Sequence, residues 1–116
     1  MTAKQCSVDA AYADNLLAVR INGEIDHHTA ASIRSDIDRE IFFYRADKVV
    51  LDLSGVSFMD SSGLGIILGR YAKIKELGGT LAILDPTPEI LKILKLAGAD
   101  KLVAIKCSAK AAREGV

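Results

Sequence analysis

The chain has 116 residues, half of them apolar, and its 15 basic and 15 acidic residues cancel. This length suits a single domain over residues 1–116, with a core that needs neither disulfides nor metal. The zero net charge argues against a protein that binds nucleic acid by neutralising many phosphates. No apolar run is long enough to span a membrane, and "MTAKQCSVDA" lacks the apolar part of a secretory signal.

The two cysteines lie near opposite ends of the chain, at Cys6 and Cys107. Such a pair suits reduced thiols better than a disulfide framework or a zinc site. We therefore expect a cytoplasmic protein without a membrane or nucleic-acid partner.

The first half of the chain predicts strands around one helix. A weak strand from about Cys6 to Ala11 precedes a clearer one over Leu16–Gly23. Apolar residues at every fourth position of Thr29–Tyr44 are typical of an amphipathic helix. The β-branched and leucine run of Lys48–Gly55 predicts a buried strand.

The second half continues this alternation. A helix over Ser61–Leu77 leads to strands over Gly78–Asp85 and Lys101–Lys106, and the final "SAKAAREGV" is a short helix or a frayed end. A third helix lies between these two strands, capped by Thr87 and ended by Gly98. The positions predicted to line its buried side are Ile90, Leu91, Leu94 and Leu96. This order predicts one small α/β domain, with a mostly parallel central sheet of about five strands flanked by helices.

Two polar segments follow predicted strands, at the edge where open α/β sheets place their sites. They are "GEIDHHT", Gly23–Thr29, and "SFMDSSGLG", Ser57–Gly65. If their strands are neighbours, the two segments meet at one edge of the sheet.

In the second segment, Asp60 fits a helix N-cap and Ser61 the first helical position, with an exposed hydroxyl. A plain helix start would explain these residues. Gly63 and Gly65 argue against a plain helix start, because each glycine inside a helix destabilises it by roughly 0.5–1 kcal/mol relative to alanine. Either a partner approaches this surface closely, or the helix backbone packs tightly on a neighbouring strand.

Several kinds of chemistry do not fit these residues. A phosphate-binding loop fails on glycine spacing, and no G-x-S-x-G elbow surrounds the serines. His27 and His28 could supply a base, but a polar helix entry explains them as well. Glu24 and Asp26 match no standard metal-ligand spacing. We therefore expect no catalytic residue, no cofactor and no metal. A phosphorylatable serine fits better, because a helix N-terminus accommodates a phosphate without unfolding.

Together, "GEIDHHTA" and "LSFMDSSGLGIILGRY" resemble the anti-sigma factor antagonists of the STAS domain family, in its sporulation branch. The resemblance covers nearly the whole chain. It implies a single STAS domain over residues 1–116 that is a regulatory binding protein rather than an enzyme. A STAS module of a general-stress or transport regulatory system is the alternative, and a small serine hydrolase is a remote one.

The resemblance also implies partners and site residues. The unphosphorylated form would bind an anti-sigma factor that is also a serine kinase, and would release the sporulation sigma factor. Phosphorylation of Ser61 would end this binding, and a serine phosphatase would restore it. The residues expected to contact the partner are Glu24, Asp26, His28, Asp60, Ser62 and Gly63. We expect the protein to be a monomer when it is free of its partner. We also expect Gly63→Leu to impair binding more than folding.

Overall fold

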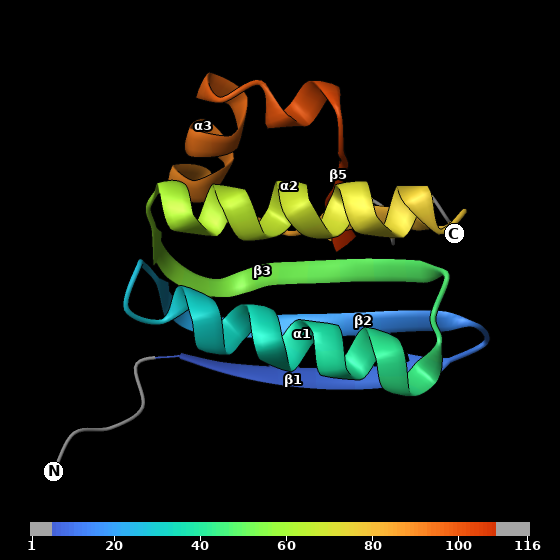
Figure 1. Cartoon of the computed structure of the whole chain (residues 1–116). Coiled ribbons are helices and arrows are strands. Elements are labelled where there is room, and N and C mark those ends of the chain that lie inside the picture. Colours follow the sequence, from blue (N-terminus) through green and yellow to red (C-terminus); the bar gives the residue numbers. More distant parts are fainter. Residues whose placement is uncertain (1–5, 109–116) are drawn as a thin grey trace, which may run out of the picture.

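The computed structural model describes residues 6–108 and shows strands that alternate with helices (Figure 1). The strands are β1 (Cys6–Ala13), β2 (Leu16–Ile25), β3 (Lys48–Met59), β4 (Thr80–Leu84) and β5 (Ala104–Lys106). The helices are α1 (Ala30–Tyr44), α2 (Ser61–Glu76), α3 (Pro88–Leu96) and the short 3-10 helix η1 (Ala99–Lys101). The tail after Ser108, predicted as a short helix or a frayed end, lies outside the described residues.

The strands form one sheet in the order β1-β2-β3-β4-β5. β1 and β2 are antiparallel, and their two-residue turn places Asp14 and Asn15 at positive φ, 53° and 65°. Such turns match the twist of the flanking strands, and Asp and Asn tolerate this backbone conformation. All later neighbours are parallel. The predicted α/β domain with a mostly parallel sheet is confirmed.

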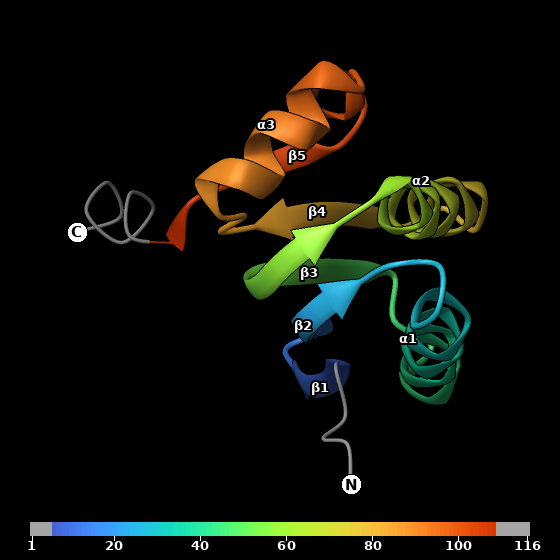
Figure 2. The same cartoon turned by 90° about the vertical axis from the view of Figure 1, so that its left-hand side faces the viewer.

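Helices α1 and α2 lie on the same face of the sheet (Figure 2), whereas α3 contacts β3 and the short helix η1. The predicted apolar stripes account for this layering. α1 buries Ile33 and Ile37, and α2 buries Ile67 and Ile74. Full burial of such a side chain contributes about 1.5–3 kcal/mol. None of the helices in the described part of the chain is long and apolar enough to cross a membrane.

Several details differ from the sequence-based predictions. β3 continues past Gly55 to Met59, because Val56 and Met59 keep contributing to the core. β5 begins only at Ala104, because η1 occupies the start of the predicted strand. Leu96 was predicted to be buried, yet it is 79% exposed. Its position two residues after the buried Leu94 turns it about 200° away, toward solvent.

Candidate functional site

The two polar segments singled out in the sequence lie together at one edge of the sheet (Figure 1). β2 and β3 are parallel neighbours, and their last residues, Ile25 and Met59, are partners in the register. The backbone N–H of Asp60 donates a hydrogen bond to the carbonyl oxygen of Ile25, at 3.1 Å. The expectation that the segments meet is therefore confirmed, and the hydrogen bond fixes the start of α2 relative to the end of β2.

The start of α2 is capped by a side chain. Asp60 is the N-cap residue, and its Oδ1 accepts a hydrogen bond from the backbone N–H of Ser62 at 2.8 Å. Ser61 is the first residue of the helix, and its side chain is exposed. The first N–H groups of a helix lack partners within the helix and carry partial positive charge. The Ser61 hydroxyl is thus an accessible nucleophile beside a surface suited to an anion.

Gly63, one turn into α2, is required by packing inside the domain. The residue is buried, and a Cβ atom there would overlap Met59 Cγ and lie 3.2 Å from Ile25 Cγ2. A Cβ at Gly65 would meet no atom within 4 Å. The backbone-packing explanation therefore holds for Gly63. The expectation that leucine at this position impairs binding more than folding is wrong, since the side chain would displace the core.

The segment between β2 and α1 is held by its own hydrogen bonds. Asp26 Oδ1 accepts from the backbone N–H groups of His28, at 2.9 Å, and Thr29, at 3.0 Å. Thr29 Oγ1 donates to the carbonyl oxygen of Glu24 at 2.9 Å. The backbone hydrogen bond from Thr29 lowers the pKa of Asp26 below its ordinary range, and the bond from His28 adds to this. Asp26 therefore orders the segment as a carboxylate.

The predicted site residues differ in exposure. Glu24 and His28 are exposed, while Asp26, Asp60 and Ser62 are half-buried. The His28 ring lies against that of His27, with 3.9 Å between the ring centroids. An exposed face of carboxylates, histidines and a serine hydroxyl suits recognition by a polar partner surface.

Phe58 is a further candidate that sequence reasoning missed. It is 50% exposed and is the register partner of Glu24 across β2 and β3. An exposed aromatic residue at a polar edge is typical of the anchors in protein interfaces. The sequence did contain a signal for Phe58, an aromatic residue just before the Asp60 cap. It was missed because this segment was predicted to be a loop rather than the end of β3.

The fold and this edge define the class of protein. The chain belongs to the STAS domain family, whose model matches residues 7–112. It is 42% identical over 90 residues to the anti-sigma F factor antagonist of Paenibacillus polymyxa. The aligned region covers 78% of this chain and 77% of the relative.

Solved structures of anti-sigma factor antagonists have the same fold. The anti-sigma factor antagonist SpoIIAA in its unphosphorylated form is 26% identical, with a TM-score of 0.74 and coverage of 95% of this chain and 98% of that one. The phosphorylated form of the Bacillus cell fate determinant SpoIIAA has a TM-score of 0.68 at 26% identity, over 95% of this chain and 100% of that one.

Proposed function

We propose that this protein is a phosphorylation-controlled anti-sigma factor antagonist of sporulation. Its unphosphorylated form binds an anti-sigma factor that is also a serine kinase, and so releases the sporulation sigma factor in the cytoplasm. Phosphorylation of Ser61 ends the binding, and a serine phosphatase restores it. The protein itself catalyses nothing and needs no cofactor. The observation that carries the proposal is the exposed Ser61 at the capped start of α2, beside the Gly23–Thr29 segment.

Ser61 suits a phosphate for an electrostatic reason. A phosphoserine carries about −1.5 to −2 charges, and a helix N-terminus stabilises negative charge. The modification therefore leaves α2 folded. At the same time it adds charge to an edge that already holds Glu24, Asp26 and Asp60. The switch then acts on the surface that the partner meets, and leaves the core unchanged.

Repulsion between the phosphate and a negative charge on the partner would be strong enough to drive release. Two like charges at ~4 Å repel by about 4 kcal/mol at an effective dielectric constant of ~20. Because ~1.4 kcal/mol changes an equilibrium constant tenfold, this repulsion weakens binding by nearly three orders of magnitude. Salt reduces the effect, so the loss of affinity is largest at low ionic strength.

The first experiment locates the phosphate. The protein is incubated with the anti-sigma factor kinase of the same organism and ATP, and its peptides are analysed by mass spectrometry. We expect the phosphate on Ser61. Ser61→Ala abolishes labelling and still binds the kinase in the presence of ADP. Ser62→Ala, the matched control one residue along the helix, remains a substrate. Phosphate found mainly on Ser62 would reject the assignment.

The second experiment tests release. The kinase is first bound to the sporulation sigma factor, and the antagonist is added while sigma factor release is followed by fluorescence anisotropy. Unphosphorylated protein releases the sigma factor, whereas the phosphorylated form does not. Treatment with the phosphatase restores release. A phosphorylated protein that releases the sigma factor as well as the unmodified one contradicts the proposed switch.

A further inference from the structure

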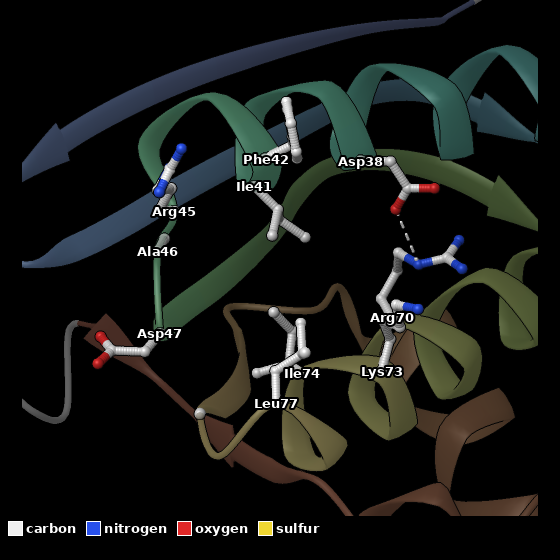
Figure 3. Close-up of a pocket in the computed structure, with 11 residues that line it drawn as sticks. Asp38, Ile41, Phe42, Arg45, Ala46, Asp47, Arg70, Lys73, Ile74 and Leu77 are labelled. Carbon is white, nitrogen blue, oxygen red and sulfur yellow. Dashed lines mark ion pairs between the residues drawn. The ribbon is translucent and has the colours of Figure 1, made fainter.

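A hollow lies between the C-terminal parts of α1 and α2, away from Ser61. It is a groove of about 710 Å³, within the range of about 300–1,000 Å³ that is typical of small-molecule sites. Figure 3 shows Ile41 of α1 facing Ile74 and Leu77 of α2 across it. Because α2 begins at Ser61 and runs the length of the sheet, its last turns lie at the opposite edge (Figure 1). The groove is therefore separate from the proposed phosphorylation site.

The middle of the groove is apolar. Ile74 is buried and Ile41 is half-buried, and together they form the floor. Leu77 stands on the rim and is 67% exposed. Burial of apolar surface is favourable in water. An elongated apolar ligand that lies along the floor therefore gains from the contact with Ile74 and from covering Leu77.

The charges of the groove are unevenly distributed. At one end, Arg70 and Lys73 of α2 lie opposite Asp38 of α1 (Figure 3). Two cations and one carboxylate leave one positive charge without a counterpart at this end. At the other end, Arg45 and Asp47 carry opposite charges, and the carboxylate of Asp47 points away from the groove (Figure 3). The groove is thus apolar along its middle and positive at the end that holds Arg70.

Arg70 has a hydrogen-bonding capacity that the described part of the chain does not use. Its side chain is only 15% exposed, and its Nε lies 3.1 Å from Asp38 Oδ1, in an ion pair between α1 and α2. This pair is not aligned as a hydrogen bond, so the buried Nε has no hydrogen-bond partner among the described residues. Buried polar groups are usually paired, and the planar guanidinium matches the two oxygens of a carboxylate. A carboxylate at this end of the groove would supply acceptors to Arg70 and balance the excess charge.

We propose that this groove binds a small amphiphilic carboxylate. The carboxylate lies at Arg70 and Lys73, and the apolar chain lies along Ile41, Ile74 and Leu77. A neutral apolar ligand leaves the positive end without a counter-charge, and a cationic ligand is repelled there. The inference does not depend on the proposed function, because no residue of the groove belongs to the edge that holds Ser61.

Titration of the full chain with sodium decanoate, below its micelle concentration, tests this proposal by amide NMR spectroscopy. We expect saturable chemical-shift changes at residues that line the groove, such as Ala46, Ile74 and Gly79, and unchanged amides around Ser61. Decyltrimethylammonium has an apolar chain of the same length with the opposite charge, and it should bind at least about tenfold more weakly. Acetate, the head group without the chain, should cause no saturable change.

Lys73→Glu tests the positive end of the groove. It should weaken decanoate binding at least about tenfold, because it replaces an attractive charge with a repulsive one. Lys75→Glu is the matched control. It makes the same change of charge in the same helix, but Lys75 lies at the hydroxyl of Tyr71 and does not line the groove. Both lysines are exposed, so thermal unfolding monitored by circular dichroism should change little in either variant.

Leu77→Asp tests the apolar part of the groove and should also weaken decanoate binding. Decanoate that causes no saturable change in the groove of the wild-type protein overturns the proposal. So does decyltrimethylammonium that binds as tightly as decanoate. Equal weakening by Lys73→Glu and Lys75→Glu overturns it as well, since the overall charge of the protein, rather than the groove, would then govern binding.

Discussion

Gly63 and Gly65 stand two residues apart in α2 and have different surroundings. Gly63 faces the core, where Met59 and Ile25 leave no room for a Cβ atom. Gly65 faces open space, so its missing side chain is not a packing requirement. An anti-sigma factor that approaches α2 closely would use the second glycine. Packing inside the domain therefore constrains Gly63 but not Gly65.

Alanine substitutions at these two glycines should change stability in opposite directions. Gly63→Ala overpacks the core and destabilises the protein by about 1–3 kcal/mol. Gly65→Ala stabilises it by about 0.5–1 kcal/mol, since alanine loses less backbone entropy in a helix. Urea unfolding of both variants measures the difference. A Gly63→Ala protein as stable as the wild type would show that Met59 moves aside without cost.

The carboxyl group of Asp26 should make folding depend on pH. Its pKa is lowered in the folded state, first by the backbone hydrogen bond from Thr29. A carboxyl group with a lowered pKa stabilises the fold at pH values above its pKa in the unfolded chain, about 3.9. This contribution is lost as the pH falls through the pKa of the folded state. Asp26→Asn should flatten the pH dependence of the unfolding free energy below about pH 4. Carbon-detected NMR titration checks the cause, and a midpoint of Asp26 at or above the ordinary value contradicts it.

At the scale of elements, α1 begins differently from α2 and α3. α2 starts at Asp60 and α3 at Thr87, and each N-cap side chain accepts a backbone hydrogen bond from its own helix. Thr29 at the start of α1 makes no such bond. Instead, the side chain of Asp26, three residues earlier, accepts a hydrogen bond from the backbone N–H of Thr29. The order of both site segments thus depends on aspartate side chains.

Removal of the α2 cap should therefore cost stability. Asp60→Ala lowers the free energy of unfolding by about 0.5–2 kcal/mol, because the N–H of Ser62 loses its acceptor. Asp60→Asn retains an acceptor and should cost less. Thr87→Ala, at the start of α3 and away from the site, provides the comparison for a cap with no proposed role in binding. Chemical denaturation measures all three, and equal stability of Asp60→Ala and wild type would contradict the role of the cap.

At the scale of the whole molecule, the proposed phosphorylation site and the core are adjacent but separate. Ser61 is exposed, whereas Ile25 and Met59 behind it belong to the single core cluster of the described residues. Interiors are packed tightly enough that a change in the core would spread through the sheet. A phosphate on the surface of α2 does not enter that packing.

Phosphorylation should therefore leave the fold in place. We expect near-native thermal unfolding and amide chemical shifts that change only around Gly23–Thr29 and Met59–Gly65. Ser61→Asp should reproduce only part of the loss of binding, because it carries less charge and volume than a phosphoserine. Shifts throughout β4 and β5 in the NMR spectrum of the phosphorylated protein would contradict a local mechanism.

The sequence by itself determined the alternation of strands and helices, the α/β class, the Asp60 cap and the exposed Ser61. These features depend on local periodicity and capping, which are set by residues close together in the sequence. Only the tertiary structure decided that β3 runs to Met59, that core side chains fill the space beside Gly63 and that Leu96 faces solvent. Each of these depends on a contact between residues from different elements, or on where an element lies relative to the core. The groove between α1 and α2 has the same origin, because no single helix contains both of its rims.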